Sequence, residues 1–378
     1  MKNSAELSIY VQMKEIRQII HKYERSDLSQ VKLAIASVVN VEESSYRRIG
    51  ARMLVSSNGN WIGGISGGCL EGDALQRSQK AIFKNVPSRV VYDTMEDDEN
   101  EIGVGLGCSG RIEVLFSPID SEDTNNPIEL LKKIVAQDQA MVLITVIEVE
   151  QSEKILGKNI IAYRPDSAPN FLDIDINLLE ENIKLTYGKK RSTITEVLSN
   201  GEKIKLLFEF IRPEMRLVIV GENYDVNALV GIVNELGWDI FLVGHKKKMH
   251  KSTFKRAKEV YDYKEFDKVP IDEYTSVLLM THDFNLDKTI LKKVIDKKPN
   301  YVGLLGPKKR GIKMETEEGL EDILELDFLH SAVGLDIGAE TPEEIAISIV
   351  SEILAVFRNR AGNKLKKRDG TIHDRNFI

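Results

Sequence analysis

The chain has 378 residues, of which 42% are hydrophobic and 29% charged, and this predicts a soluble globular protein of two domains. A net charge of −7 argues against a dedicated nucleic-acid binder, and no apolar run approaches the ~18 residues of a membrane span. Two cysteines provide no disulfide framework, and residues 1–10 show no signal-peptide pattern, so we expect a cytoplasmic protein.

Apolar spacing in the first part of the chain predicts a mixed α+β domain. An amphipathic entry helix is expected at residues 6–23. Strands are expected at residues 31–40, 51–56, 88–93, 111–116 and 141–149, with further helices after residue 72 and at residues 128–135. Residues 151–205 have a weaker pattern, which we interpret as short strands and polar turns.

A glycine-rich turn follows the strand predicted at residues 51–56. Residues 62–72 contain five glycines, at Gly63, Gly64, Gly67, Gly68 and Gly72. Glycine permits a positive φ and a close approach of ligand to the main chain, and the amides at the start of the following helix favour an anion. The turn is therefore a candidate anion-binding site.

Both cysteines of the chain lie in glycine-rich turns. Cys69 belongs to the turn just described, and Cys108 to a second cluster at residues 103–110. A thiol before a helix is biased towards thiolate, which is a nucleophile and a soft metal ligand. The alternative is that each is a small buried side chain, but the repeated setting favours a site.

A polar loop at residues 42–53 contains three arginines and two adjacent serines, Ser44 and Ser45. The planar guanidinium of Arg47 suits phosphate, and serine hydroxyls add donors. Taken alone, the loop fits a solvated surface equally well. An acidic stretch from Asp93 to Glu101 lacks the spacing of a calcium loop and is interpreted as solvated.

The second domain begins as a βαβ unit of a doubly wound sheet. Residues 216–220 form an apolar strand that ends at Gly221, a helix follows at residues 224–236, and a second strand at residues 239–243. Only the first glycine of the dinucleotide fingerprint is present, and the second strand ends in Gly244-His245 rather than an acid. The sequence therefore favours the fold and argues against NAD(P). The domains are predicted as residues 1–212 and 213–360, with a polar tail at 361–378.

Polar groups are predicted at the carboxyl edge of this sheet. The strand at residues 276–280 runs into Thr281, His282 and Asp283, and Asp283 also fits a helix cap. A fourth strand at residues 301–305 precedes a glycine turn with three basic residues. Near the end, Thr341 and Glu344 form a capping box. The preceding loop, residues 334–340, carries Asp336 between two glycines, which helix capping does not explain.

These motifs resemble the xanthine dehydrogenase accessory protein family, XdhC/CoxI. The resemblance rests in the first domain on Ser44-Ser45, Arg47, residues 50–55 and residues 67–71, and in the second on residues 281–283, 303–306 and 334–346. It runs from about Val31 to His373 in the family's order. The implied fold is α/β, with an N-terminal α+β XdhC/CoxI-type domain followed by a Rossmann-like doubly wound parallel-sheet domain.

The resemblance implies a chaperone that binds molybdenum cofactor, protects its sulfurated form and delivers it to apo-xanthine dehydrogenase or a related molybdenum hydroxylase. The resemblance also implies a cysteine desulfurase as a partner and a homodimeric assembly. It implies that the protein itself does not catalyse a reaction. Cys69 and Cys108 become candidate molybdenum contacts. The other implied cofactor-binding residues are Ser45, Arg47, Gly67, Gly68, Thr281, His282 and Asp336.

The sequence departs from the family pattern at three places. Tyr46 stands where proline is usual, Pro307 stands where serine is usual, and Gly244-His245 replaces an acid-containing strand end. Two alternative functions are an NAD(P)-dependent oxidoreductase with His282 as general acid, and a cofactor-free scaffold between dehydrogenase and desulfurase. For the chaperone, we expect the Cys69 turn and the Thr281 strand end to face one cleft, within a chain or across a dimer.

Overall fold

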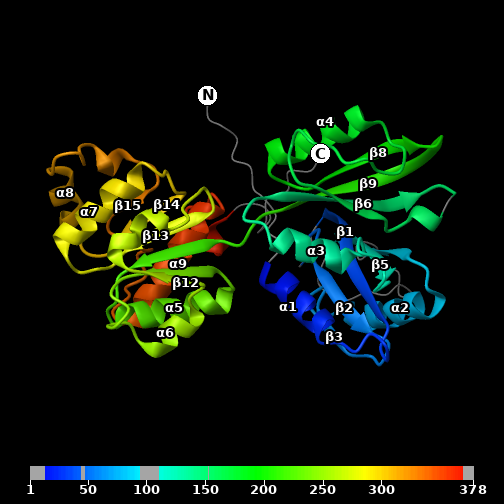
Figure 1. Cartoon of the computed structure of the whole chain (residues 1–378), viewed down its shortest axis with the longest axis horizontal. Coiled ribbons are helices and arrows are strands. Elements are labelled where there is room, and N and C mark those ends of the chain that lie inside the picture. Colours follow the sequence, from blue (N-terminus) through cyan, green and yellow to red (C-terminus); the bar gives the residue numbers. More distant parts are fainter. Residues whose placement is uncertain (1–12, 44–46, 94–109, 152, 369–378) are drawn as a thin grey trace. The chain divides into compact units, whose positions relative to one another are not determined.

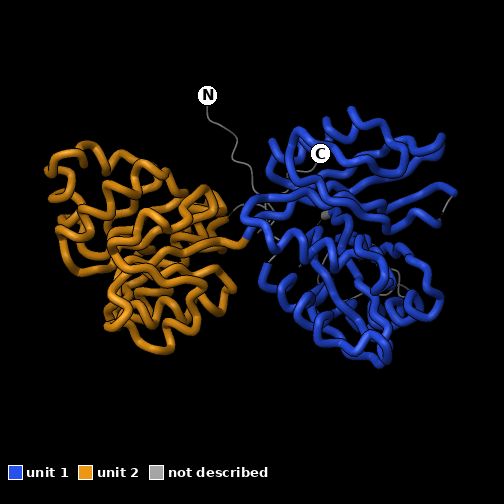
Figure 2. The backbone as a smooth tube through the Cα atoms, viewed as in Figure 1, with its two compact units in different colours: residues 1–213, 370–378 blue, residues 214–369 orange. Residues whose placement is uncertain are grey.

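The structure is a computed structural model that describes residues 13–43, 47–93, 110–151 and 153–368. The chain forms two compact units, which meet in the sequence between Pro213 and Glu214 (Figure 2). Each unit is described by itself. The predictions that concern Ser44, Ser45 and Tyr46, the acidic stretch after Asp93, Cys108, the start of the entry helix and the end of the C-terminal tail lie outside the described residues.

The first unit contains a five-stranded antiparallel sheet in the order β3-β2-β1-β5-β4 (Figure 1). The elements of this part are α1 (Met13–Glu24), β1 (Leu33–Glu43), β2 (Arg52–Ser56), β3 (Trp61–Gly63), α2 (Glu71–Lys84), β4 (Ser88–Asp93), β5 (Gly110–Pro118) and α3 (Pro127–Val135). All strands predicted here are present.

Alternation along β2 explains why this sheet is covered on both faces. Met53 and Val55 pack with the inward side of α2, whereas Leu54 packs with α1 and α3. Successive side chains of a strand point to opposite faces, so one short apolar run serves two cores. The glycine turn follows β3 and leads directly into α2.

A second antiparallel sheet completes the unit, in the order β7-β6-β9-β8. Its elements are β6 (Met141–Val149), β7 (Asn159–Ala162), α4 (Ile176–Lys189), β8 (Thr193–Ser199) and β9 (Glu202–Ile211). It packs against the first sheet through a small cluster of buried residues, Val39, Leu115, Ile147 and Leu207.

Helix α4 corrects the prediction of short strands and polar turns in residues 151–205. Two of its four buried residues are polar, Asn182 and Thr186, so the apolar spacing of a helix is incomplete. Their oxygen atoms lie 2.6 and 2.7 Å from the hydroxyls of Thr195 and Thr193 on β8. The helix docks through hydrogen bonds where a periodicity search looks for apolar groups. Asp175, which caps its start, was the available signal.

The second unit is a doubly wound domain around a parallel sheet, as predicted. The sheet has six strands in the order β12-β11-β10-β13-β14-β15. Its strands are β10 (Arg216–Val220), β11 (Asp239–Val243), β12 (Glu259–Tyr261), β13 (Thr275–Leu279), β14 (Tyr301–Leu304) and β15 (Leu329–His330). Its helices are α5 (Asp225–Leu236), α6 (Lys251–Arg256), α7 (Phe284–Ile295), α8 (Lys308–Glu315) and α9 (Pro342–Phe357). The edge strands β12 and β15 were not predicted because they are only three and two residues long.

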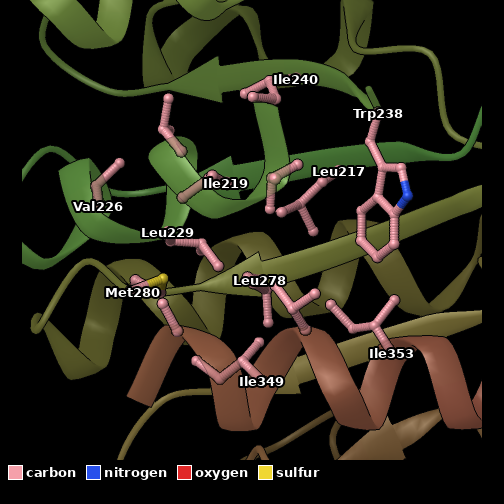
Figure 3. Packing of buried hydrophobic residues seen from close by; sticks show 14 of the residues in the cluster. Leu217, Ile219, Val226, Leu229, Trp238, Ile240, Leu278, Met280, Ile349 and Ile353 are labelled. Carbon is pink, nitrogen blue, oxygen red and sulfur yellow. The ribbon is translucent and has the colours of Figure 1, made fainter. Parts of the chain in front are cut away.

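The sheet is buried on both faces, as a parallel sheet requires. Leu217 and Ile219 of β10 pack towards α5 and α9, and Figure 3 shows Ile349 and Ile353 of α9 pointing at Leu278 of β13. Val218 and Val220 of β10 pack on the other face, towards α7 and α8. Strand order reverses between β10 and β13, which places the topological switch point there.

Two predicted caps are present in this unit. Asp283 accepts hydrogen bonds from the amides of Asn285 and Leu286 at the start of α7. Thr341 and Glu344 form the reciprocal capping box of α9, with Pro342 in the first turn. These helix starts follow from local sequence alone, since each cap uses residues within three positions of one another.

Candidate functional site

The glycine turn of the first unit is held together by Ser66 and Glu71. The Ser66 hydroxyl accepts hydrogen bonds from the amides of Gly68, Cys69 and Leu70 at 3.0–3.2 Å. The Glu71 carboxylate accepts from the amides of Ile65 and Ser66, at 3.2 and 2.8 Å, and from the Ser66 hydroxyl. Most amides of the turn before α2 are therefore already bonded to the protein's own oxygens.

Burial raises the pKa of Glu71, but hydrogen bonds from Ser66 and from nearby backbone amides outweigh that effect. The pKa of this carboxyl therefore lies below its usual range, and the group is ionised at neutral pH. A negative charge in the first turn of α2 is also favoured by the helix dipole. An anionic ligand would therefore have to displace the Glu71 carboxylate from the amides of Ile65 and Ser66.

Cys69 is exposed, in contrast to the usual burial of a free thiol. Its backbone is fixed by the Ser66 hydroxyl, and it lies two residues before the start of α2. Gly67 and Gly68 beside it are exposed as well, and Gly68 adopts φ +113°, a conformation that suits glycine. The turn presents the thiol at the protein surface on a defined backbone.

Arg47 is held beside the glycine turn by Glu15 of α1. One oxygen of the Glu15 carboxylate pairs with the Arg47 guanidinium, and the other lies 3.2 Å from the amide nitrogen of Gly64. Both side chains are largely buried, with 25% of Arg47 and 15% of Glu15 exposed. Helix α1 thus connects two loops that were predicted separately, the arginine loop and the glycine turn.

Arg52, a second arginine of the same loop, has a structural role. Its guanidinium pairs with Glu209 of β9 at 2.5 Å and donates to the carbonyl of Gly50 at 2.6 Å. Both charged side chains are less than 5% exposed. The pair links the two sheets of the unit, so the motif arginine at this position serves folding.

In the second unit, the main chains of two loops touch at the switch point. A Cβ placed on Gly221 would lie 2.6 Å from the carbonyl oxygen of Met280, so only glycine fits after β10. From this contact the loops diverge. One carries Glu222 towards the end of β11, and the other carries His282 towards the start of α5.

Glu222 fills the space next to Gly244 at the end of β11. Its carboxylate accepts from the backbone amide of His245 at 2.5 Å and lies 3.0 Å from the His245 ring and 3.2 Å from the Lys248 ammonium. Burial raises the pKa of Glu222, but these bonds and one from Tyr263 outweigh it and lower the pKa overall. A dinucleotide site has a carboxylate at the end of the second strand. Here the carboxylate comes from Glu222, in the loop after β10, and it is already bonded to His245 and Lys248.

His282 and Asp283 are exposed in the predicted Thr281-His282-Asp283 segment, and Thr281 is partly buried. The Thr281 hydroxyl lies 2.6 Å from the buried carboxylate of Asp287, so Thr281 has a structural partner. The ring of His282 pairs with Asp225 of α5 through Nε2 at 2.8 Å, and 56% of the side chain is exposed. Its backbone has φ +60°, an uncommon conformation for histidine.

Asp336 lies exposed in the loop before α9. The loop is fixed to α9 at its beginning, where the Gly334 amide donates to Glu352 at 2.9 Å and the Ser348 hydroxyl donates to the Leu335 carbonyl. A Cβ on Gly334 would clash with the Ser348 hydroxyl. Gly334 is therefore required by packing against α9, whereas the side chain of Asp336 is exposed to solvent.

The partners of the predicted residues were missed from the sequence. Each of five side chains bonds a predicted residue or its neighbour: Glu15, Ser66, Glu71, Asp225 and Glu222. Of these, only Ser66 and Glu71 lie close enough in sequence to their partners to have been found by local capping rules. Within the described ranges, no cluster of three or more histidine, cysteine and acidic side chains could hold a metal, and no helix could cross a membrane.

Comparison with known proteins identifies the family. The model described as "XdhC and CoxI family" matches residues 28–93, and that of the "XdhC Rossmann domain" matches residues 217–353, together more than half of the chain. The chain belongs to the XdhC and CoxI family.

Relatives match over most of their length. A Bacillus subtilis protein, named as a probable subunit of xanthine dehydrogenase, is 27% identical over 86% of this chain and 93% of its own. The Escherichia coli "Molybdenum cofactor insertion chaperone PaoD" is 20% identical over 85% of this chain and 82% of its own. A crystal structure from Bacillus halodurans, described as a xanthine dehydrogenase, superposes with a TM-score of 0.71 at 26% identity, covering 92% of this chain and 96% of the other.

Proposed function

We propose that this protein is an accessory chaperone that binds molybdenum cofactor, protects its sulfurated form and delivers it to an apo-dehydrogenase of the xanthine dehydrogenase type. The names of the relatives support a role in maturation of such an enzyme. The observation that carries the proposal in this chain is the exposed Cys69 thiol on a fixed turn beside Arg47.

The chemistry of the cargo fits the residue types of the first unit. The cofactor has a soft, sulfur-rich metal end and an anionic phosphate end, so a binder needs a soft ligand and cationic or amide donors at separate points. Cys69 supplies the first, and the loops at Arg47 and Gly64 supply the second. Cys108 is proposed as a further contact of the metal end, and Ser45 as a phosphate donor.

Partners and assembly belong to the same proposal. A maturation chaperone must contact the enzyme that receives its cargo, and a cysteine desulfurase is the proposed source of cofactor sulfur. We propose a homodimer with no enzymatic turnover of its own. His282 and Asp336, both exposed in the second unit, are the proposed contacts there, with Thr281 supporting the His282 backbone.

The test replaces the thiols. Cys69→Ser and Cys108→Ser, alone and combined, are expected to leave the thermal melting temperature unchanged but to lower the pterin and molybdenum content of protein from a cofactor-competent host. They should also lower the xanthine oxidation recovered when that protein is mixed with apo-dehydrogenase. A double variant that retains and delivers cofactor as well as wild type would contradict the proposal.

A further inference from the structure

We infer that the Arg47 guanidinium and the Gly64 amide form the binding site for the cargo's phosphate, and that Glu15 of α1 occupies this site as an internal competitor. The inference rests on the proposed function, because it assigns the anionic end of the same cargo. It also replaces the amides of Gly67 and Gly68 with a different donor.

The geometry around Glu15 is that of a bound anion. Its carboxylate pairs with the Arg47 guanidinium through one oxygen and approaches the Gly64 amide at 3.2 Å through the other. A guanidinium and a backbone amide are the donors that bind phosphate in proteins. Gly63, which has φ +80°, leaves room on both sides: a Cβ there would clash with the Arg52 carbonyl and would lie 3.0 Å from the Glu15 carboxylate.

The carboxylate does not use all of the donors. The Nε of Arg47 is buried and has no hydrogen-bond partner among the described residues. The Gly64 amide is shared, since it also donates to the carbonyl of Arg52 at 2.9 Å. A phosphate group presents more acceptor oxygens than a carboxylate and carries more charge, so it can engage the donor that Glu15 leaves unused.

Four other amides of the turn already have acceptors. Those of Gly68 and Cys69 are bonded to Ser66, and those of Ile65 and Ser66 to Glu71, which is only five or six residues away on the same segment. Glu15 lies on a separate helix, whose position beside β3 and β2 can be followed in Figure 1. A rotation of its side chain frees the site, while the buried residues of α1 keep the helix in place.

The experiment titrates the full-length protein with phenyl phosphate, a simple phosphate monoester, by calorimetry and ³¹P NMR. Glu15→Gln should bind about tenfold more tightly than wild type, because the competing ionic bond with Arg47 is removed. Added salt should weaken this binding. Glu24→Gln is the matched control: it removes the same charge from the same helix at an exposed residue that pairs with Lys132, and it should bind as wild type does.

Combining Glu15→Gln with Arg47→Ala should abolish the gain. The inference fails if Glu15→Gln binds phenyl phosphate no more tightly than Glu24→Gln, or if the combined variant keeps the gain. Glu15→Asp, which retains the charge but shortens its reach, provides a second test should Glu15→Gln not fold, and it too should bind more tightly than wild type.

Cofactor content separates this inference from the proposed function. If Arg47→Ala loses cofactor but Glu15→Gln does not change phosphate affinity, the chaperone role stands and the competitor is wrong. If wild-type protein never carries pterin but Glu15→Gln gains phosphate affinity, the site stands and the proposed cargo is wrong.

Discussion

The glycine turn of the first unit and the sheet edge of the second are both places where the sequence predicts ligand-binding residues. In both, carboxylates of the protein already bond the donors. In the turn, Glu71 and Glu15 do so while the thiol of Cys69 stays exposed. At the sheet edge, Glu222 bonds the backbone and ring of His245 at the end of β11.

The difference lies in what each region leaves available. The turn leaves a thiol and an incompletely bonded arginine, which are groups for a soft metal and a phosphate. The sheet edge leaves an exposed histidine, His282, paired with Asp225, and it keeps only the first glycine of a dinucleotide fingerprint, Gly221. A glycine-rich or Rossmann-like pattern therefore indicates a place for a ligand, and the neighbouring carboxylates decide which ligand.

The largest effect expected on stability concerns the two arginines of the loop before β2. Arg52→Met should lower the free energy of unfolding by about 3–5 kcal/mol, because it leaves the Glu209 carboxylate buried without its cation. Arg47→Met should cost less, about 1–2 kcal/mol, because a quarter of the Arg47 side chain is exposed and Glu15 keeps its approach to the Gly64 amide. Denaturant unfolding measures both.

Replacing both partners provides the control. Arg52→Met combined with Glu209→Leu substitutes apolar groups for the buried pair and should recover most of the lost stability. Equal costs for Arg52→Met and Arg47→Met would show that the structural and ligand-binding roles of the two arginines are not separate.

An intermediate effect is expected for Glu71→Gln. The carboxylate accepts three hydrogen bonds from the turn, so its loss should cost about 2 kcal/mol at pH 7. Because folding lowers the pKa of Glu71, its contribution is fully present above about pH 4.3, the unfolded value, and is lost as the pH falls through the folded value. Unfolding curves of wild type and variant should therefore converge in acid.

Glu196→Gln is the matched control for this prediction, since Glu196 is half exposed and pairs with Lys203 on the surface. It should change stability by less than about 1 kcal/mol. A pH-independent difference between Glu71→Gln and wild type would mean that the turn does not depend on the ionised carboxylate.

The smallest effect is expected when NAD(H) or NADP(H) is added to the protein. Glu222 and Asp225 carry negative charge near the switch point, where the phosphates of a dinucleotide would lie, and the second and third fingerprint glycines are replaced by Asn223 and Val226. Calorimetry should detect no micromolar site. Such a site, together with hydride transfer to a small substrate, would favour the oxidoreductase and remove the difference between the two regions.

The sequence by itself determined most of the secondary structure, the doubly wound class of the second unit and the family. These features depend on short-range patterns: period-two and helical spacing, a strand ending at Gly221, and the caps at Asp283 and Thr341. Such signals are complete within a few residues. Where docking is polar, as at Asn182 of α4, the pattern was incomplete and the helix was missed.

The tertiary structure decided which groups are already bonded. Glu15 and Arg47 are 32 residues apart, Arg52 and Glu209 are 157, and Asp225 and His282 are 57. The sequence predicts Arg47 as a phosphate-binding residue and His282 as a site residue. Nothing in the local spacing says which carboxylate pairs with either side chain. That information exists only once packing brings distant strands and helices together, because a charge selects its partner by distance in space.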